Sequence, residues 1–292
     1  MPELPEVETT ARALRKKILG RKIKGAVATA PQLFHDKKLF RDIGIALRGD
    51  KFSAIDRYGK YLLFRLRSGR TMITHMKLTG HFLVVGRAVK RSSTPLRYSR
   101  VSKWSTVGKY VRFQIDFADG TKLLFSDVRK FGHIWLLAPD KVPGFFTDKK
   151  LAHDALSKEA SETYLHTKLK RNRAVKSLLL DQTIIAGIGN IYADELLWRA
   201  KIHPLHKGLS LSEHEAAEIH KAMRDILHRG IKAGGTTMRD YRQPDGSSGY
   251  FQMLRAVYQR AGQPCPRCKT PIQRIVVAQR GTHYCPKCQR EN

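Results

Sequence analysis

The first eight residues of the chain, Met1 to Glu8, read MPELPEVE and carry groups that could perform covalent chemistry. Removal of Met1, which is usual before a small second residue, would leave Pro2 with a free secondary amine. Such an amine can attack a sugar C1′ to give an iminium ion, which is an electron sink for breaking C–O bonds by elimination. Glu3 beside it is a natural proton carrier for that reaction. The same residues also suit an ordinary helix N-terminus, where proline starts the helix and glutamate complements its dipole.

The strongest motif in the chain is a pair of Cys-x2-Cys sequences separated by 16 residues. It consists of Cys265, Cys268, Cys285 and Cys288. Each pair can bind one metal from a tight turn, and four thiolates form a closed tetrahedral site without room for a substrate. We therefore expect one structural Zn2+, with an iron–sulfur centre as the alternative. Because these are all the cysteines of the chain, scattered disulfides are not expected, which favours a reducing compartment.

The chain is strongly basic. Among its 292 residues, 55 lysines and arginines stand against 25 acidic residues, so the formal net charge is +30. Such a balance favours a polyanionic partner, most simply a nucleic acid. The sequence has no apolar run of about 18 residues and no signal-peptide pattern, so we expect no membrane partner and a cytoplasmic location.

Apolar spacing predicts an α+β chain in which these groups lie on regular elements. The spacing at the N-terminus predicts a first helix over about 3–19, with Pro2 at its positive end. Short β-prone runs follow, and the clearest, at 110–117, alternates apolar and polar residues before an Asp119-Gly120 turn. Six or more such strands predict an N-terminal antiparallel β-sandwich that carries the first helix.

The second half of the chain has a different pattern. From about residue 157 the apolar spacing becomes helical, and Ser212 with Glu215 forms a capping box before an apolar stripe. The cysteine motif then ends the chain as a β-hairpin finger, with an Arg280-Gly281 turn at its tip. The expected domains are a catalytic β-sandwich at 1–138, a linker at 139–156, a helical domain at 157–250 and a C4 zinc finger at 251–292.

The N-terminal run MPELPEVE resembles that of the bacterial formamidopyrimidine-DNA glycosylases, which excise oxidised purines from damaged double-stranded DNA and cut the strand. The resemblance implies that Pro2 is the nucleophile and Glu3 the proton donor. Lys60, within RYGKYLL, matches the family's catalytic lysine, which can steady a phosphate and lower the pKa of a neighbouring amine by like-charge repulsion. Arg280, within QRGT, matches a finger arginine that binds the phosphates flanking the lesion.

Further motifs of this family occur in family order along nearly the whole chain. The run SDVRKFG at 126–132 resembles a wedge in which Arg129 pairs with the orphaned base and Phe131 enters the duplex. Leu78 stands where a methionine is usual, and the glycine-rich stretch at 234–251 resembles a loop that closes over the extruded base. The implied DNA contacts are Glu6, Leu78, Tyr110, Arg129, Phe131, Asn172, Lys176, Asn190, Tyr258 and Arg280.

The run from Asp181 to Asn190 is a glycine-rich link between two helical stretches. An asparagine at a helix start, after glycines, presents free backbone N–H groups to an anion. The run also resembles the helix–two-turn–helix of the same family, whose asparagine contacts a phosphate. Two positions depart from the family pattern, because Asn172 replaces a lysine of some relatives and Tyr110 replaces a frequent histidine.

These features favour a bifunctional DNA glycosylase and abasic-site lyase, in which Pro2 attacks C1′ and the iminium drives β- and then δ-elimination. The resemblance implies a monomer in the bacterial cytoplasm, associated with the nucleoid through DNA. Two alternatives stay open. One is an endonuclease VIII-like enzyme for oxidised pyrimidines, and the other is a zinc-ribbon nucleic-acid-binding protein without chemistry.

The resemblance does not explain the stretch 86–109, which carries seven positive charges and no acidic residue. Tyr98 and Trp104 are interleaved with these charges, which suits a surface that follows a nucleic-acid strand, whereas a solvated spacer is the alternative. Each neutralised phosphate steepens the salt dependence of DNA binding by roughly 0.9 in log–log slope. Replacing residues 88–107 with a short Gly-Ser linker should flatten that slope by about 2 to 4 units without changing lesion preference. An unchanged slope in salt titrations would make the stretch a spacer.

Overall fold

The computed structural model of the chain describes residues 1–86, 108–237 and 241–291. Most of the basic stretch 86–109, and residues 238–240 of the glycine-rich loop, lie outside the described residues. The chain forms two compact units. The N-terminal unit consists of Met1–Pro2, Glu6–Val142 and Thr236–Gly249, and the C-terminal unit consists of Glu3–Pro5, Pro143–Gly235 and Tyr250–Asn292.

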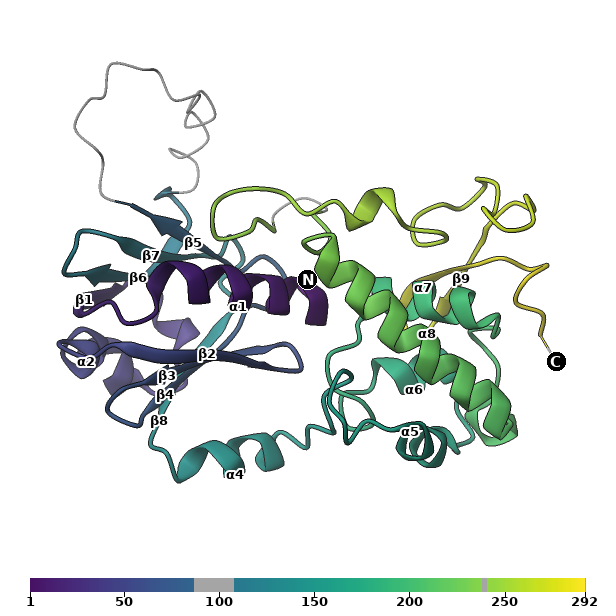
Figure 1. Cartoon of the computed structure of the whole chain (residues 1–292), viewed down its shortest axis with the longest axis horizontal. Helices are drawn as coiled ribbons and strands as arrows, with labels where there is room; N and C mark the ends of the chain where they lie inside the picture. Colours follow the sequence, from purple (N-terminus) through teal and green to yellow (C-terminus); the bar gives the residue numbers. More distant parts are fainter. Residues whose placement is uncertain (87–107, 238–240, 292) are drawn as a thin grey trace, which may run out of the picture. The chain divides into compact units, whose positions relative to one another are not determined.

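Antiparallel strands of the N-terminal unit form two sheets within the described residues (Figure 1). One has the order β1 (Ile23–Ala28), β6 (Val111–Phe117), β7 (Lys122–Ser126) and β5 (His81–Val85). The other has the order β2 (Phe52–Tyr58), β3 (Tyr61–Leu66), β4 (Thr71–His75) and β8 (His133–Leu137). Alternation explains β6, because Phe113, Ile115 and Phe117 are buried while the residues between them are partly exposed. The expected antiparallel sandwich is confirmed.

A chain of phenylalanine rings connects the two sheets. The ring centroids are 5.3 Å apart between Phe52 and Phe64, 5.4 Å between Phe64 and Phe82, and 4.9 Å between Phe82 and Phe125. The rings are tilted against one another, an arrangement that aromatic pairs favour. All four side chains are fully buried, so they form the centre of the sandwich core.

Helix α1 (Leu4–Ile18) packs into this core, and Figure 1 shows it running beside the strands. Its buried residues Val7, Ala11, Leu14 and Ile18 recur at the helical spacing that the sequence indicated. The helix ends before Gly20, whose positive φ of 72° is a conformation that glycine adopts without strain. The first helix expected over about 3–19 is therefore confirmed.

Sequence patterns did not indicate β1, β2, β8 or helix α2 (Lys37–Leu47). In β1 and β2 the strand pairing shifts register, between Ile23 and Gly25 and between Phe52 and Ala54 respectively. A bulge of this kind breaks the two-residue alternation that marks a strand in a sequence. The burial patterns of β1 and β2 accordingly lack strict alternation, whereas the register shift in β6 falls before Phe113 and leaves its alternation intact.

Helices build the C-terminal unit. They are α5 (Glu162–Leu169), α6 (Val175–Leu180), α7 (Asn190–Ala200) and α8 (Glu213–Lys232), and α4 (Lys141–Asp148) precedes them. The expected capping box is present, because the Ser212 hydroxyl accepts the Glu215 N–H and the Glu215 carboxylate accepts the Ser212 N–H. Every helix in the described ranges is too short or too polar to cross a lipid bilayer.

The two units divide the chain differently from the expected domains. Helix α4 occupies the stretch expected as a linker, and none of its residues is buried. Residues 236–249 belong to the N-terminal unit, whereas the sequence grouped them with the helical domain. The reason is local hydrogen bonding: the Thr236 N–H donates to the Glu6 carboxylate at 2.6 Å, and the Val84 N–H donates to the Pro244 carbonyl at 2.7 Å. The functional domain limits stay a prediction.

The finger hairpin consists of β9 (Gln273–Val277) and β10 (Arg280–Tyr284). Its two turn residues are Ala278 and Gln279, with φ values of 49° and 58°, rather than the expected Arg280-Gly281. Two successive positive φ values are typical of the tight turn that suits a two-residue hairpin. Glycine is preferred there, so the real turn, which lacks glycine, gave no signal. Arg280 pairs with Val277 as the first residue after the turn, which keeps it at the end of the hairpin.

Candidate active site and nucleic-acid interface

The carboxylate of Glu3 lies at the N-terminus of α7. It accepts hydrogen bonds from the backbone N–H groups of Ile191 at 3.1 Å and Tyr192 at 3.4 Å, and the residue is only 3% exposed. The first N–H groups of a helix have no partner within the helix and lie at the positive end of its dipole. The sequence indicated that this helix start would present free N–H groups to an anion. For these two donors the anion is the carboxylate of the chain's own third residue.

Two glycines make room for this arrangement. A Cβ on Gly189 would lie 2.3 Å from Cδ of Glu3, and a Cβ on Gly187 would lie 2.6 Å from Cδ1 of Leu4. Gly187 also has a φ of +113°, and its carbonyl accepts the Leu4 N–H at 3.1 Å. The glycine-rich link found in the sequence is therefore the surface on which residues 3 and 4 rest.

Pro2 immediately precedes Glu3 and is buried, whereas Met1 before it is 49% exposed. Glu6, one turn into α1, is also buried, and its carboxylate accepts the Thr236 N–H as described above. The Glu6 carbonyl accepts a hydrogen bond from the Tyr241 hydroxyl at 3.0 Å. The first turn of α1 thus holds the start of the glycine-rich loop in the N-terminal unit.

Lys60 follows Gly59 in the turn between β2 and β3 and is 7% exposed. The Arg57 side chain supports this turn, because its Nη1 donates to the Gly59 carbonyl at 3.0 Å and its Nε lies 3.1 Å from Oε2 of Glu8. Burial of Glu8 raises the pKa of its carboxyl, but the hydrogen bond from Arg12 and the charge of Arg57 outweigh it, so the pKa lies below its usual range. The Glu8–Arg57 pair therefore ties helix α1 to the turn that carries Lys60.

His75 is a neighbour of Lys60 that sequence reasoning missed. It pairs across β3 and β4 with Tyr61, with ring centroids 4.7 Å apart, and its Nδ1 accepts the Lys77 N–H at 3.0 Å. Burial, with the positive charges of Lys77 and Lys60, lowers the pKa of His75 to about 3. The imidazole is therefore neutral across the physiological range. Its sequence signal was only its place at the end of β4, before Leu78.

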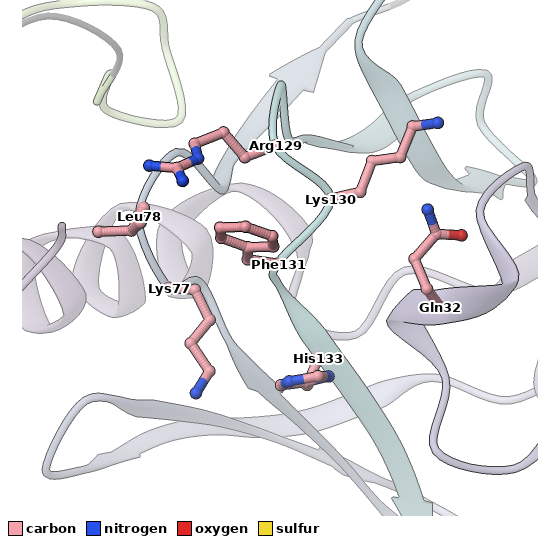
Figure 2. Close-up of a pocket in the computed structure, with 7 residues that line it drawn as sticks. All are labelled: Gln32, Lys77, Leu78, Arg129, Lys130, Phe131 and His133. Atoms are coloured by element: carbon pink, nitrogen blue, oxygen red, sulfur yellow. The ribbon is translucent and has the colours of Figure 1, made fainter.

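The three residues expected to form a wedge lie together in the N-terminal unit. Leu78, Arg129 and Phe131 line one open hollow of about 550 Å³ (Figure 2). The Arg129 guanidinium lies 4.6 Å from the centre of the Phe131 ring, and Phe131 is 47% exposed. The other lining residues are Gln32, Lys77, Lys130 and His133. Exposed apolar side chains beside cations suit a surface that meets nucleic acid.

A buried carboxylate holds both loops of this hollow. Asp127 is fully buried, and it accepts a hydrogen bond from the Thr79 hydroxyl on the loop after β4. It also accepts the N–H groups of Arg129 at 3.2 Å and Gly132 at 2.8 Å. The Asp127 N–H itself donates to the carbonyl of Tyr110, which places that expected DNA contact beside the same loop. Asp127 therefore fixes the backbone on which the three wedge side chains stand.

Close backbone packing adds to this support. A Cβ on Gly132 would lie 2.7 Å from Cζ of Phe125, and a Cβ on Gly80 would lie 2.4 Å from the Met76 carbonyl oxygen. Both loops thus close over a core ring that only glycine lets them approach.

The four cysteines of the C-terminal unit form a metal site. Their Sγ atoms all lie within 4.8 Å of one another, with 4.0 Å between Cys265 and Cys288 and 3.4 Å between Cys268 and Cys285. A zinc tetrahedron with Zn–S bonds of about 2.3 Å has S–S edges of roughly 3.8 Å. The Trp198 indole N–H also donates to Sγ of Cys265 at 3.4 Å, as suits a thiolate. The residues fit one structural zinc, as the sequence indicated.

The remaining expected DNA contacts lie in the C-terminal unit. Arg280 is exposed at the end of the hairpin, and Asn172 is exposed on the turn between α5 and α6. The Asn190 side chain donates to the Gly281 carbonyl at 3.0 Å. Tyr258 is partly buried, its ring centroid lies 5.3 Å from that of His283, and its N–H donates to Glu195 at 2.8 Å. Lys176 differs from these residues because it is completely buried.

The role of Asp127 in holding the loops of Leu78 and of Arg129 and Phe131 can be tested by mutation. Asp127→Ala removes the acceptor of the Gly132 N–H and of the Thr79 hydroxyl, so it should lower the free energy of unfolding of the N-terminal unit by roughly 2–4 kcal/mol in urea titrations. It should also speed hydrogen exchange at the Gly132 amide, whereas the Arg129 amide keeps the Thr79 hydroxyl as a second acceptor at 3.1 Å. The exposed Asp140 serves as control, and Asp140→Ala should change stability by less than about 0.5 kcal/mol. Unchanged exchange in Asp127→Ala would contradict the assignment.

Comparisons with known proteins agree with this geometry. Models of the formamidopyrimidine-DNA glycosylase N-terminal domain and of its H2TH domain match residues 1–134 and 151–242, and a zinc finger found in FPG and IleRS matches residues 262–290. A formamidopyrimidine-DNA glycosylase of Ligilactobacillus salivarius is 42% identical, with 99% of each chain covered.

Solved structures give the same result. A Lactococcus lactis FPG variant in complex with DNA containing Fapy-dG has a TM-score of 0.86 at 36% identity, covering 99% of this chain and 100% of that chain. The Lactococcus lactis Fpg complex with DNA containing an abasic site has a TM-score of 0.85 at the same identity and coverage. The chain therefore belongs to the formamidopyrimidine-DNA glycosylase family.

Proposed function

We propose that this chain is a bifunctional DNA glycosylase and abasic-site lyase that excises oxidised purines, including 8-oxoguanine and formamidopyrimidines. The relatives it matches over 99% of its length are named formamidopyrimidine-DNA glycosylases. The solved complexes it resembles hold Fapy-dG DNA and abasic-site DNA, which are a substrate and an intermediate of this reaction. The two alternatives, an endonuclease VIII-like enzyme and a zinc-ribbon binder without chemistry, have no comparable support.

The reaction begins at Pro2 once Met1 has been removed. The amine of Pro2 attacks C1′ of the damaged nucleotide, the bond from C1′ to the base breaks, and the base leaves with a proton. Loss of the amine proton and cleavage of the C1′–O4′ bond, with a proton delivered to O4′, open the sugar ring and give an iminium ion, which withdraws electrons from the sugar. Removal of a proton from C2′ then breaks the C3′–O bond in β-elimination, and δ-elimination breaks the C5′–O bond.

Glu3 carries protons in these steps. Its carboxylate is held by two backbone N–H groups and is next to Pro2 in the chain, so it is fixed beside the reacting amine. Lys60 supplies a positive charge that steadies the phosphate and disfavours protonation of the amine. The observation that carries the proposal is the fit of Glu3 against Gly189, because this contact leaves no room for any larger residue at position 189.

DNA binding rests on the wedge hollow and on the finger. Arg129 takes the place of the extruded nucleotide opposite the orphaned base, while Leu78 and Phe131 fill the gap in the stack. Arg280 binds the phosphates beside the lesion, supported by zinc, whose binding energy serves as folding energy for the finger. Further contacts to the DNA backbone come from Tyr110, Asn172, Asn190 and Tyr258. Because one chain supplies all these groups, a monomer suffices.

Covalent trapping tests the function. Borohydride should reduce the iminium between the wild-type enzyme and abasic DNA to a stable adduct, and the adduct should be lost in Pro2→Gly and in a chain that retains Met1. Glu3→Gln should abolish excision of 8-oxoguanine while DNA affinity stays within about threefold, because the change affects proton supply and not phosphate contacts. An adduct of equal yield in the chain that retains Met1 would exclude Pro2 as the nucleophile.

Gly189→Ala tests how Glu3 is held. The new methyl group must displace the Glu3 carboxylate, so the rate of excision should fall by about 100-fold, as expected for a misplacement of about 1 Å. DNA affinity, measured by titration with uncleavable abasic DNA, should stay within about threefold. Gly144→Ala is the matched control, because a Cβ at Gly144 meets nothing within 4 Å. Wild-type excision by Gly189→Ala would mean that the position of Glu3 is unimportant.

A further inference from the structure

Lys176 lies on α6 with its ammonium group inside the C-terminal unit. Its side chain and that of Asp194 on α7 are both 0% exposed, and Nζ of Lys176 lies 2.5 Å from Oδ1 of Asp194. Burial lowers the pKa of Lys176, and the charge of the Asp194 carboxylate opposes that shift. A buried ion pair is stable only if further hydrogen bonds satisfy both groups.

Those further hydrogen bonds go to the finger hairpin. Nζ of Lys176 donates to Oγ1 of Thr282 at 2.6 Å and to the carbonyl oxygen of Gly281 at 3.4 Å. Oδ2 of Asp194 accepts the backbone N–H of His283 at 2.8 Å and lies 3.2 Å from its Nδ1. The ion pair therefore holds three consecutive residues of β10, and these directly follow Arg280.

The ammonium group has no donor left for DNA. A lysine ammonium carries three N–H bonds, and those of Lys176 face Asp194, Thr282 and Gly281. A phosphate could bind Nζ only after the finger strand had moved away. This geometry differs from a direct DNA contact, which is the role that the family resemblance implied for Lys176.

The hairpin needs such support. Its two strands pair only with each other within the described residues, and an isolated two-stranded hairpin is marginally stable in water. The zinc ligands Cys265, Cys268, Cys285 and Cys288 lie at the other end of the hairpin from the turn. At the turn end, the strand that carries Arg280 is held by the Lys176–Asp194 pair and by the Asn190 amide.

We propose that Lys176 acts on DNA through the finger: with Asp194 it is a positioning residue that fixes residues 281–283 and so directs Arg280 at the phosphate. The proposal rests on the phosphate-binding role of Arg280 in the proposed function. It assigns to Asp194 and Thr282 a part in DNA binding, although neither side chain reaches the surface.

Salt titrations with DNA that contains an uncleavable abasic-site analogue distinguish positioning from direct contact. Arg280→Ala should lower the log–log salt slope by about 0.9, since one phosphate contact is lost. Lys176→Met should lower it by the same amount, and the double variant Lys176→Met/Arg280→Ala should lower it no further, because both changes remove one contact. A fall of about 1.8 in the double variant would show two separate contacts and overturn the proposal.

Thr282→Val gives the answer without disturbing any charge. It removes one acceptor of Lys176 and the hydroxyl that donates to the Arg280 carbonyl at 3.0 Å, so positioning predicts binding to the abasic analogue that is about three- to tenfold weaker. Adding Thr282→Val to Arg280→Ala should weaken binding no further, because both changes remove the same phosphate contact. A direct contact by Lys176 predicts unchanged binding. The control is Lys170→Met, because Nζ of Lys170 donates to the Leu211 carbonyl at 2.7 Å and holds no part of the finger. Its affinity should match the wild type.

Zinc content separates these effects from loss of the fold. Each variant should retain one zinc per chain. If Lys176→Met loses its zinc, the test rests on Thr282→Val instead. If Arg280→Ala leaves the salt slope and affinity unchanged, the role of Arg280 in the proposed function is wrong, and the proposal falls with it. If Arg280→Ala weakens binding while Thr282→Val does not, the proposed function stands and the positioning role alone is wrong.

Discussion

The first N–H groups of helix α7 need acceptors outside the helix, and the carboxylate of the chain's own third residue accepts two of them. Because the Glu3 carboxylate occupies the N–H groups of Ile191 and Tyr192, the backbone next to Pro2 is anchored at one fixed point. Gly187 and Gly189 precede the helix, and a Cβ at these positions would clash with Leu4 and Glu3 respectively. Glycine at both positions therefore allows the close contact between the two chain segments. The same helix carries Asp194, so both residue 3 and the finger strand are held by helix α7.

Acidic residues are few in this basic chain, and several of them serve as internal acceptors for backbone N–H groups. Asp127 holds the wedge loops, and Glu6 holds the start of the glycine-rich loop. Glu195 accepts the N–H groups of Ala256, Val257 and Tyr258 at 2.7–3.0 Å, and its burial raises the pKa of the carboxyl. These buried carboxylates let cations cover the outer surface while the loops keep a defined shape.

How much could be predicted from the sequence depended on the kind of signal. The zinc ligands and the capping box at Ser212 have fixed spacings, because their geometry is local. The hairpin turn was misplaced because Ala278 and Gln279 adopt conformations that glycine usually marks. The helix-start partners of Glu3 and the finger partner Thr282 of Lys176 could not be found, since they lie 188 and 106 residues away along the chain and spacing carries no information about them.

The tethering of the wedge by Asp127 has a consequence for the exposed side chains. Asp127 and Thr79 bind the backbone of Arg129 and Gly132, and His75 accepts the Lys77 N–H, so buried side chains below the exposed tips shape the two loops. Leu78 is 38% exposed, so its side chain can change without disturbing the backbone of the loop. The side chains at positions 78, 129 and 131 can therefore change while the backbone beneath them keeps its shape. The hollow thus combines replaceable exposed side chains with a backbone that buried groups hold in one shape.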